Sequence, residues 1–435
     1  MKASSMSRAI EMAKLVTQIG IKELRSGDVK SRYEQAFLIT KSLSQLKGAA
    51  MKAGQLLSLD LDNYFPPEAI EILSQLQSAA VAHPFSEIER VISSQIPLEK
   101  RKLVHSIDKV PLGVASIGQV HRARYQEIDI VLKVQYADVA ESVDSDLKIL
   151  KTLAQTFCQL TGRKMNLEPL FLEFKDILEQ ELDYTREAQF QNEYFEKVQR
   201  LKGKSECTFS VPKSFSEISS KKVLAMTFQP GLTLRSWLNQ NPSELDKKNV
   251  AVAILDLYFH EFFEWGLVQT DPNWGNFLIH QKPSEINICL LDFGACRLYK
   301  RDFIQNYIRL LDLASKNKSK ELRTLSIEFG LIDARESEMA FKSFENMLKT
   351  AIKPFFSHSS MASQDFDFSD VRHSIESQAA AKALSQELVY SPPPYSIVFL
   401  HRKLAGVYSI LKNLKVRLDV SPYWQMMKDL SEGKS

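Results

Sequence analysis

The order of apolar and polar residues divides the chain into a helical start, a strand-rich segment and a long helical remainder. Between residues 107 and 136 apolar and polar positions alternate and Val and Ile are frequent, which predicts three antiparallel strands joined by tight turns. On either side of this segment, apolar residues recur at the spacing of an amphipathic helix. The helices expected before and after these strands cover residues 31–59, 68–79, a short segment after Pro84, 138–160 and 167–200.

The second half of the chain is predicted to be helical around one central hairpin. Strands at residues 208–211 and 222–228 lead to a Gln-Pro-Gly turn. The hairpin consists of apolar runs at 277–279 and 286–291, with a turn-forming Lys-Pro-Ser between them. We therefore expect an α+β protein with a small mixed lobe and a larger, mostly helical lobe. Helices are expected at 245–265, 302–313, 318–329, 336–350 and 394–414, with a polar loop at 357–368.

Length and composition limit the number of domains and the class of partner. A chain of 435 residues suggests about two or three domains. We expect a helical extension over residues 1–105, a small lobe over 106–230 and a helical lobe over 231–435. The net charge of +3 is small for this length, so the chain lacks the basic footprint of a nucleic-acid-binding protein, and no nucleic-acid partner is predicted.

Cysteine spacing and hydropathy bear on the cellular compartment. The four cysteines show no C-x-x-C spacing, which favours a reducing compartment over a disulfide framework. Glu11 and Lys14 interrupt the apolar residues near the start, so a cleaved secretory signal is not expected. The most apolar segment, residues 250–268, contains charged side chains, and no membrane span is predicted. These features favour a cytoplasmic protein, or one of the mitochondrial matrix if the source is eukaryotic.

The candidate chemistry lies in residues 266–298. Asp271 is followed five residues later by Asn276, and the hairpin beyond them ends in Asp292, the first residue of an Asp-Phe-Gly sequence. Protein kinases have this spacing in their catalytic loop and magnesium site. Asp-Phe-Gly alone is an ordinary turn, but hard oxygen donors in this order suit a magnesium ion bridging phosphate groups. We therefore predict that Asn276 and Asp292 bind the metal and that Asp271 is catalytic.

A nucleotide-binding loop is expected in the strand-rich segment. Gly113, Gly118 and Val120 match three of the four fixed positions in the kinase pattern G-x-G-x-x-G-x-V, and Ala115 replaces the middle glycine. A partial glycine motif is weak evidence by itself. The residues predicted to line the nucleotide in this loop are Gly113, Val114, Ala115, Ser116, Gly118 and Val120.

Lys133 follows two apolar residues at the end of a predicted strand, as the phosphate-binding lysine of kinases does. The simpler alternative is an edge-strand lysine facing water. If Lys133 is catalytic, its acidic partner is expected among Glu181, Asp183 and Glu187. Asp183 and Glu187 are four residues apart and would share a helix face, and Glu187 is our first choice. Met226, before the Gln-Pro-Gly turn, is predicted to lie near the adenine ring, with an ordinary core position as the alternative.

Together these motifs resemble those of the UbiB family of atypical kinase-like proteins, which comprises the ADCK group and bacterial relatives linked to ubiquinone biosynthesis. The resemblance covers roughly residues 42–414. Its components are KAGQ, similar to the family's K-x-G-Q motif; PLGVASIGQVHRA, similar to its alanine-rich loop; ELDYTREA, with its E-x-D; QTDPNWGNF and LLDFG, similar to its catalytic loop and magnesium site; and SPPPYSIVFLHRKLAGVYS, similar to the C-terminal region of the ADCK branch.

The resemblance implies a two-lobed protein-kinase-like fold with an N-terminal helical extension over the active cleft. It implies that Lys52 and Gln55 of K-x-G-Q reach the nucleotide phosphates, whereas the segment alone favours simple solvent exposure. It also assigns Glu181 and Asp183 of E-x-D to the cofactor site. The implied cofactors are ATP and Mg²⁺, with hydrolysis or transfer to a small or lipid-like acceptor, such as a prenyl lipid or quinone intermediate.

Some residues depart from the family pattern, and two other functions stay open. Gly113 and Val114 stand where the family prefers alanines, and Gln269-Thr270 replaces the His-Arg of ordinary kinases. The chain ends in polar residues, so a C-terminal membrane anchor is not expected, although peripheral membrane contact through amphipathic helices remains open. The alternatives are a pseudo-kinase scaffold that binds nucleotide or a prenyl lipid, and a phosphotransferase for a small soluble metabolite. The sequence does not indicate an oligomeric state.

Overall fold

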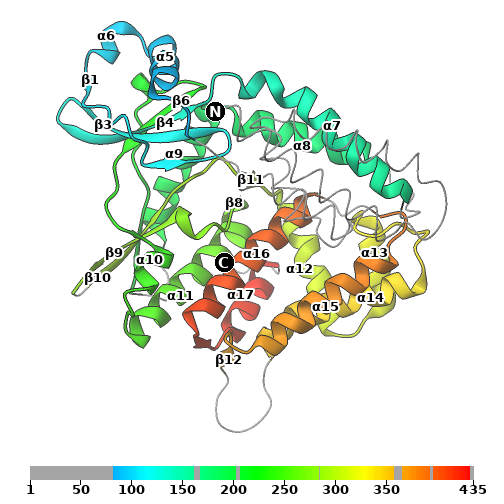
Figure 1. Ribbon diagram of the computed structural model, residues 1–435. Helices are drawn as coiled ribbons and strands as arrows, with labels where there is room; N and C mark the ends of the chain where they lie inside the picture. Colours follow the sequence, from blue (N-terminus) through cyan, green and yellow to red (C-terminus); the bar gives the residue numbers. More distant parts are fainter. Residues whose placement is uncertain are drawn as a thin grey trace, which may run out of the picture. The chain divides into compact units, whose positions relative to one another are not determined.

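The computed structural model describes residues 82–160, 167–201, 206–283, 285–356, 365–391 and 395–431 (Figure 1). Contacts within the chain divide it into two compact units. Unit 1 comprises residues 1–123, 132–183 and 221–223, and unit 2 comprises residues 124–131, 184–220 and 224–435. The helices expected at 31–59 and 68–79 lie outside the described residues, and the expected boundaries after residues 105 and 230 stay predictions.

The first described elements are two short helices, then four strands, then two longer helices. These strands and the later β6 (Val223–Thr227) form a five-stranded sheet in the order β1-β3-β4-β6, with β2 paired to β3. The β2–β3 pair is antiparallel, as expected for the 107–136 segment. Side chains of β3 alternate between buried and exposed positions towards its end, as a half-buried strand requires. The elements are α5 (Phe85–Gln95), α6 (Leu98–Arg101), β1 (Val104–His105), β2 (Gly113–Val114), β3 (Gly118–Tyr125), β4 (Ile128–Gln135), α7 (Val139–Leu160) and α8 (Glu168–Glu181).

The single helix predicted for residues 167–200 is wrong, because the chain forms two helices there. α8 ends at Glu181 and α9 (Tyr184–Arg200) begins after a break at Leu182 and Asp183. The backbone N–H of Asp183 donates to Gln180, a tight turn that closes α8. Asp183 therefore does not share a helix face with Glu187, and that part of the argument for an acidic partner of Lys133 fails.

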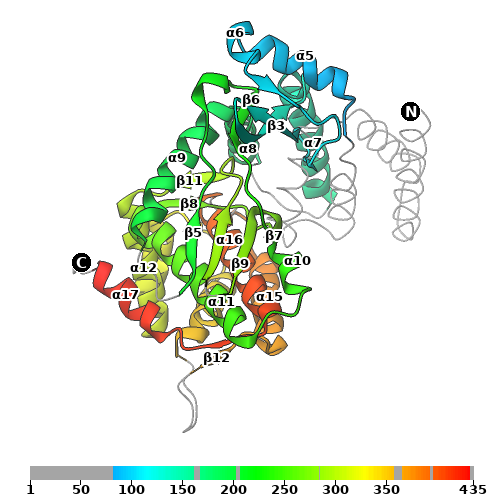
Figure 2. The same cartoon turned by 90° about the vertical axis from the view of Figure 1, so that its left-hand side faces the viewer.

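Unit 2 contains a second sheet and most of the helices. Its four-stranded sheet has the order β5-β10-β9-β7, and Figure 2 shows β5, β9 and β7 in this part of the chain. The β9–β10 hairpin confirms the predicted one (Figure 1). The strands are β5 (Thr208–Ser210), β6 (Val223–Thr227), β7 (Leu232–Thr233), β8 (Leu267–Gln269), β9 (Phe277–Lys282), β10 (Glu285–Leu290), β11 (Cys296–Leu298), β12 (Phe366–Asp367) and β13 (Arg417–Leu418).

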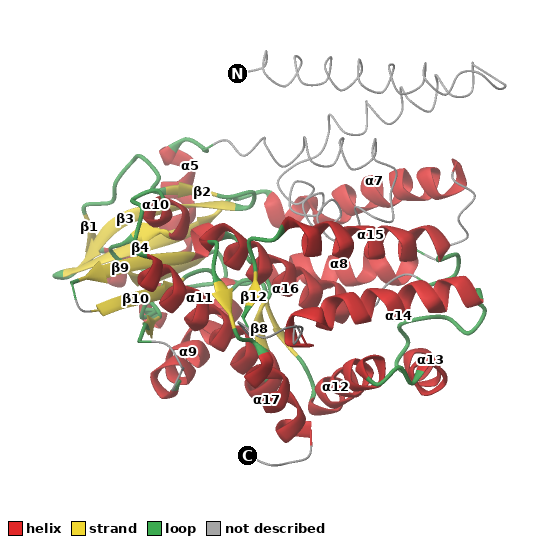
Figure 3. Cartoon of the chain, turned by 90° about the horizontal axis from the view of Figure 1, so that it is seen from below, coloured by secondary structure: helices red, strands yellow, loops and turns green. Residues whose placement is uncertain are grey.

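The helices of unit 2 include all five that were expected there, together with three that were not. The unexpected ones are α10 (Leu234–Leu238), α15 (Val371–Glu387) and α17 (Ser421–Ser431). Figure 3 shows α14 and α15 side by side, in agreement with their contacts. None of the described helices is long and apolar enough to cross a membrane. The expected helices are α11 (Glu244–Phe259), α12 (Arg301–Ser315), α13 (Ser319–Glu328), α14 (Glu338–Ile352) and α16 (Tyr395–Leu414).

α11 lies at the centre of unit 2. Its side chains from Val250 to Phe259 are almost all buried and apolar on every face, which is the pattern of an interior helix. The Ser243 hydroxyl caps its start by accepting from the N–H of Asp246. One π-helical turn follows, and the chain then leaves through Gly266 at φ 61°. A Cβ there would lie 2.7 Å from the carbonyl oxygen of Tyr299, so only glycine fits where the chain enters β8.

Candidate active site

The loop between β8 and β9 holds the first two predicted site residues in direct contact. The amide nitrogen of Asn276 donates to the Asp271 carboxylate at 3.0 Å and to the Asp271 carbonyl oxygen at 3.3 Å. A short 3-10 turn, Trp274–Asn276, makes this possible because it turns the chain back after Asn273. Since the amide nitrogen faces Asp271, the amide oxygen of Asn276 is turned away from it and is available as a hard donor.

Asp292 lies beside this loop because the hairpin returns to it. The N–H of Leu291 donates to the carbonyl oxygen of Asn276 at 2.8 Å. This bond holds Asp292, the residue after Leu291, next to Asn276. Asp292 has φ 60°, a left-handed conformation that aspartate tolerates better than most residues. Its carboxylate accepts from the N–H of Gly294 at 3.2 Å, and its carbonyl oxygen accepts from the Gln269 side chain at 3.2 Å.

Glu187 approaches the same turn from α9. A Cβ built on Gly294 would lie 3.3 Å from an Asp292 carboxylate oxygen and 3.4 Å from a Glu187 carboxylate oxygen, so both carboxylates border one small space. Glu187 is only 3% exposed. Like charges this close disfavour one another unless a cation lies between or beside them. The Glu187 carboxylate thus lies beside the Asp292 carboxylate, in unit 2.

The donor set fits magnesium better than a metal that needs several protein ligands. Within the described ranges, no three His, Cys, Asp or Glu side chains gather as a metal site of their own. Mg²⁺ suits a sparser arrangement, because it commonly uses one or two carboxylates and completes its shell with substrate phosphates and water. Asn276 and Asp292 supply oxygen donors of that kind.

A basic residue that the sequence did not single out holds the catalytic loop. The guanidinium of Arg402, on α16, donates to the second Asp271 carboxylate oxygen at 3.0 Å, and the two side chains are 9% and 14% exposed. Asp271 is therefore bonded by Asn276 on one oxygen and Arg402 on the other. A charge-assisted hydrogen bond with so little exposure to solvent fixes the carboxylate in one orientation.

The next residue of α16 lies in a buried polar network behind the site. The Lys403 ammonium is 2.8 Å from a Glu261 carboxylate oxygen, and both side chains are almost inaccessible to water. Burial raises the pKa of Glu261, and the nearby Lys403 ammonium and the Tyr194 hydroxyl oppose that rise. Lys403 also reaches the side-chain oxygen of Gln269 at 3.4 Å, and Gln269 in turn bonds the backbone at Asp292. The Asp-Phe-Gly turn is thus tied to α16 through Gln269.

α16 touches the catalytic loop directly at a glycine. A Cβ on Gly406 would lie 1.8 Å from the Cβ of Pro272, the residue after Asp271. No side chain is small enough to stand at position 406 without moving the helix or the loop. Arg402, Lys403 and Gly406 all lie in the C-terminal HRKLAG segment. The family resemblance included this segment but gave its residues no role.

Unit 1 contains the predicted nucleotide loop. Gly113 pairs with Val120, and the N–H of Ala115 donates to Gly118 at 2.8 Å, so the partial glycine motif forms a tight hairpin. Val114 is exposed and Ser116 is half-buried in this hairpin. The hairpin shape agrees with a phosphate-covering loop but does not test nucleotide contact.

Lys133 is half-buried on β4 of unit 1. Two residues further along the same strand face, the Gln135 side chain donates to the carbonyl oxygen of Leu182 at 3.0 Å. This bond brings Glu181 and Asp183 of the E-x-D motif close to β4.

The remaining predicted contacts are not tested. Glu187 and Met226 belong to unit 2, so the pairing of Lys133 with Glu187 stays a prediction, as does the contact of Met226 with adenine. Lys52 and Gln55 lie outside the described residues.

Residues 75–326 match the model of the ABC1 atypical kinase-like domain, which is more than half of the chain. The chain belongs to the ABC1 atypical kinase-like family. The expected membership of the UbiB group of atypical kinases is thereby confirmed. A kinase-like phosphotransferase scaffold is what this family has in common, and the site built from Asp271, Asn276 and Asp292 lies inside the matched residues.

Curated relatives of this ABC1 family are similar over most of the chain. The mitochondrial atypical kinase COQ8 of Schizosaccharomyces pombe is 31% identical over 390 residues, covering 88% of this chain and 60% of that protein. The mitochondrial COQ8 of Saccharomyces cerevisiae is 32% identical over 371 residues, covering 85% and 71%. This chain spans 48% of the length of coq-8 of Caenorhabditis elegans and 77% of COQ8B of Rattus norvegicus.

A solved structure has the same fold. The chain is similar to the structure of Rv3197 from Mycobacterium tuberculosis in complex with erythromycin, with a TM-score of 0.58 and 23% identity, covering 92% of this chain and 96% of that one. With the family match, this likeness confirms the expected α+β protein-kinase-like fold.

Proposed function

We propose that this protein is a Mg²⁺-dependent atypical kinase or ATPase that binds ATP and acts in prenyl-quinone biosynthesis, ubiquinone being the expected product class. The observation that carries the proposal is the contact of Asp271 with Asn276, joined by one backbone hydrogen bond to the turn that holds Asp292. This arrangement supplies an amide oxygen and a carboxylate for the metal beside a second, fixed carboxylate.

Each of the described side chains has a defined task in the proposal. Asn276 and Asp292 hold the metal, which supplies positive charge against the phosphate oxygens when it is bound. Asp271, fixed by Arg402, accepts a hydrogen bond from the attacking hydroxyl or water and so orients it. Gly294 leaves space beside both carboxylates that a Cβ would fill.

Residues outside this group contribute to nucleotide binding. Lys133 would pair with the α and β phosphates, and Glu187 would orient Lys133. The residues proposed to line the rest of the nucleotide site are Gly113, Val114, Ala115, Ser116, Gly118, Val120, Glu181, Asp183 and Met226, with Lys52 and Gln55 of the K-x-G-Q segment.

The pathway is proposed from the family and not from the site. The relatives named COQ8 are described as mitochondrial atypical kinases. By analogy we propose a prenyl lipid or quinone intermediate as acceptor or ligand, and peripheral contact with the membrane where such lipids reside. The corresponding location is the mitochondrial matrix in a eukaryote, or the cytoplasmic side of the inner membrane in a bacterium.

Nucleotide binding is tested by unfolding with and without Mg-ATP. A ligand present at about 100 times its dissociation constant adds about 2.7 kcal/mol to the stability of the state that binds it. We expect a rise in the melting temperature with Mg-ATP and a smaller one with ATP and EDTA. The absence of any shift at millimolar Mg-ATP would overturn the assignment.

Turnover is tested by phosphate release from the wild type and Asp292→Asn. Asparagine has the same shape, tolerates φ near 60°, and keeps an oxygen to accept from Gly294, so the variant is expected to fold while losing the carboxylate charge. Release that falls to background in Asp292→Asn supports an enzyme. Equal release in both proteins would leave only the scaffold alternative.

The pathway is tested in a deletion strain that carries either the wild type or Asp292→Asn. Lipid mass spectrometry is expected to show early quinone precursors that disappear only with the wild type. Rescue by both proteins would mean that the pathway needs the protein but not the proposed chemistry.

A further inference from the structure

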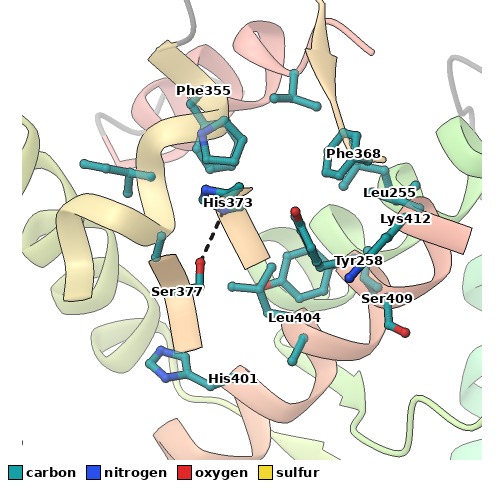
Figure 4. A pocket seen from close by; sticks show the side chains of 18 of the residues that line it. Leu255, Tyr258, Phe355, Phe368, His373, Ser377, His401, Leu404, Ser409 and Lys412 are labelled. Carbon is teal, nitrogen blue, oxygen red and sulfur yellow. Dashed lines mark hydrogen bonds between the residues drawn. The ribbon is translucent and has the colours of Figure 1, made fainter. Parts of the chain in front are cut away.

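Unit 2 encloses a cavity of about 530 Å³ between α11, α14, α15 and α16 (Figure 4). Its volume lies within the range of small-molecule binding sites, roughly 300–1,000 Å³. A folded interior normally leaves few voids larger than a water molecule. An apolar space of this size is therefore a feature of the fold that needs an occupant or a use. None of the residues assigned above to the metal or the nucleotide lines it.

The wall of the cavity is mostly aromatic and aliphatic. Tyr258, Phe355 and Phe368 line the space, together with Leu255 and Leu404 (Figure 4). An apolar wall favours an apolar ligand, because burial of apolar surface stabilises the complex by roughly 25 cal/mol for each Å² removed from water.

The two histidines in the wall are held neutral. His401 is half-buried, and its desolvation lowers its pKa to about 4. Burial also lowers the pKa of His373, and the Lys353 ammonium lowers it further. Lys412 is the one lysine or arginine among the described lining residues, and it is half-buried.

A few polar atoms are placed to receive a hydrogen-bonding group. Ser377 and His373 line the cavity from α15. Ser377 and His373 are 3.5 Å apart, at the limit of a hydrogen bond, so both retain capacity for another partner (Figure 4).

α16 separates this cavity from the catalytic loop. His401, Leu404, Ala405 and Tyr408 line the cavity, at the spacing of one helix face. The residues between them, Arg402, Lys403 and Gly406, contact Asp271, Glu261 and Pro272 respectively. One helix therefore carries both the wall of the cavity and the support of the loop.

We propose that this cavity is a binding site for an uncharged, largely apolar small molecule that carries a hydroxyl or carbonyl group. The molecule places its apolar body against the aromatic wall and its polar group near Ser377 and His373. Because α16 also supports the catalytic loop, occupancy makes that loop more rigid. This site does not depend on the nucleotide chemistry proposed above.

The test is a fluorescence titration of the full chain with Nile red, an uncharged aromatic dye with a carbonyl group. We expect saturable binding with the blue-shifted emission of an apolar site. Phe in place of Ala381, which lines the cavity from α15, is expected to weaken binding by about tenfold or more because the ring occupies the same space. The matched control is Ala383→Phe on the same helix, where the side chain is exposed and outside the cavity.

Several results would overturn the proposal. These are the absence of saturable binding, which includes the case in which another segment of the chain fills the cavity, and equal affinity for the wild type and Ala381→Phe. The anionic dye 1-anilinonaphthalene-8-sulfonate is expected to bind more weakly at this site, and tighter binding than that of Nile red would overturn the ligand charge. Ser377→Leu is a second cavity-filling variant if Ala381→Phe fails to unfold cooperatively.

Hydrogen exchange locates the bound dye without any variant. Saturating Nile red is expected to slow exchange of the amides of α15 and α16, and to a smaller degree those of the loop from Asp271 to Asn276. Protection confined to other helices would place the dye elsewhere and refute the site. Since no nucleotide is present, this result is independent of the nucleotide-binding and turnover tests.

Discussion

Gly406→Ala tests whether α16 truly supports the catalytic loop. In an ordinary exposed helix this change is stabilising by about 1 kcal/mol, because alanine is the better helix former. Here the added Cβ would lie 1.8 Å from the Cβ of Pro272 and 2.4 Å from its Cγ. The two predictions therefore differ in sign, which makes the substitution decisive.

The magnitude follows from the distances. Carbon atoms in contact are about 3.5–4.0 Å apart, so α16 and the loop must separate by nearly 2 Å. Overpacking of this kind costs about 1–3 kcal/mol, part of which the helix propensity offsets. We expect a net loss of about 1–2 kcal/mol. The bond from Arg402 to Asp271, now 3.0 Å long, would lengthen with the same movement.

The assay is urea unfolding in a double-mutant cycle with Pro272→Gly. That change removes the two clashing atoms, and the nearest remaining atom of residue 272 is its Cα, 3.3 Å from the new Cβ. The double variant is expected to be more stable than the sum of the single changes predicts, by about 1–2 kcal/mol. A stabilised Gly406→Ala protein, or strict additivity, would show that the helix does not press on the loop.

Three further substitutions probe the same helix. Lys403→Met should lower the free energy of unfolding by about 3–5 kcal/mol, because Glu261 stays buried without its cation. Loss of Lys403 raises the pKa of Glu261 further, so urea unfolding should show a larger loss of stability at pH 8 than at pH 5. An equal loss at both pH values would contradict this. Arg402→Met should lower kcat for phosphate release more than it changes KM, because Asp271 orients the attacking group; a change in KM alone would contradict that role. Between pH 7 and pH 4.5 the wild type should lose about 2 kcal/mol of stability that His401→Phe keeps. Burial lowers the pKa of His401 to about 4, so as the pH falls the unfolded state takes up the proton first. The same pH dependence in both proteins would refute this.

The closeness of the three residues of the predicted metal and catalytic site was predictable because it is local. Asp271, Asn276 and Asp292 lie within one loop and one hairpin, and hydrophobic alternation was enough to predict that the hairpin brings its end back to the loop. The α8–α9 break was missed because neither Leu182 nor Asp183 is a helix breaker and the apolar period continues through them. What ends α8 is a local turn, which periodicity does not reveal.

Arg402 and Lys403 could not be found from spacing. Arg402 is 131 positions from the aspartate that it bonds, and on a helical pattern two adjacent basic residues are most simply interpreted as solvent-facing. Their burial depends on how α16 packs against the loop, which only the tertiary structure defines. The role of Gly406 could not be predicted either. A glycine inside a helix indicates weak helix propensity but does not indicate which residue packs beside it.

The position of these residues along the chain has a consequence for folding. Asp271 belongs to the matched kinase-like residues 75–326, whereas its support comes from α16, which lies beyond them. One of the two side-chain hydrogen bonds to the Asp271 carboxylate comes from Arg402, so the loop has both bonds only when α16 is packed against it. The same helix also forms a wall of the cavity. A ligand that fills the cavity and a substitution that loosens α16 must act on the catalytic loop in opposite directions.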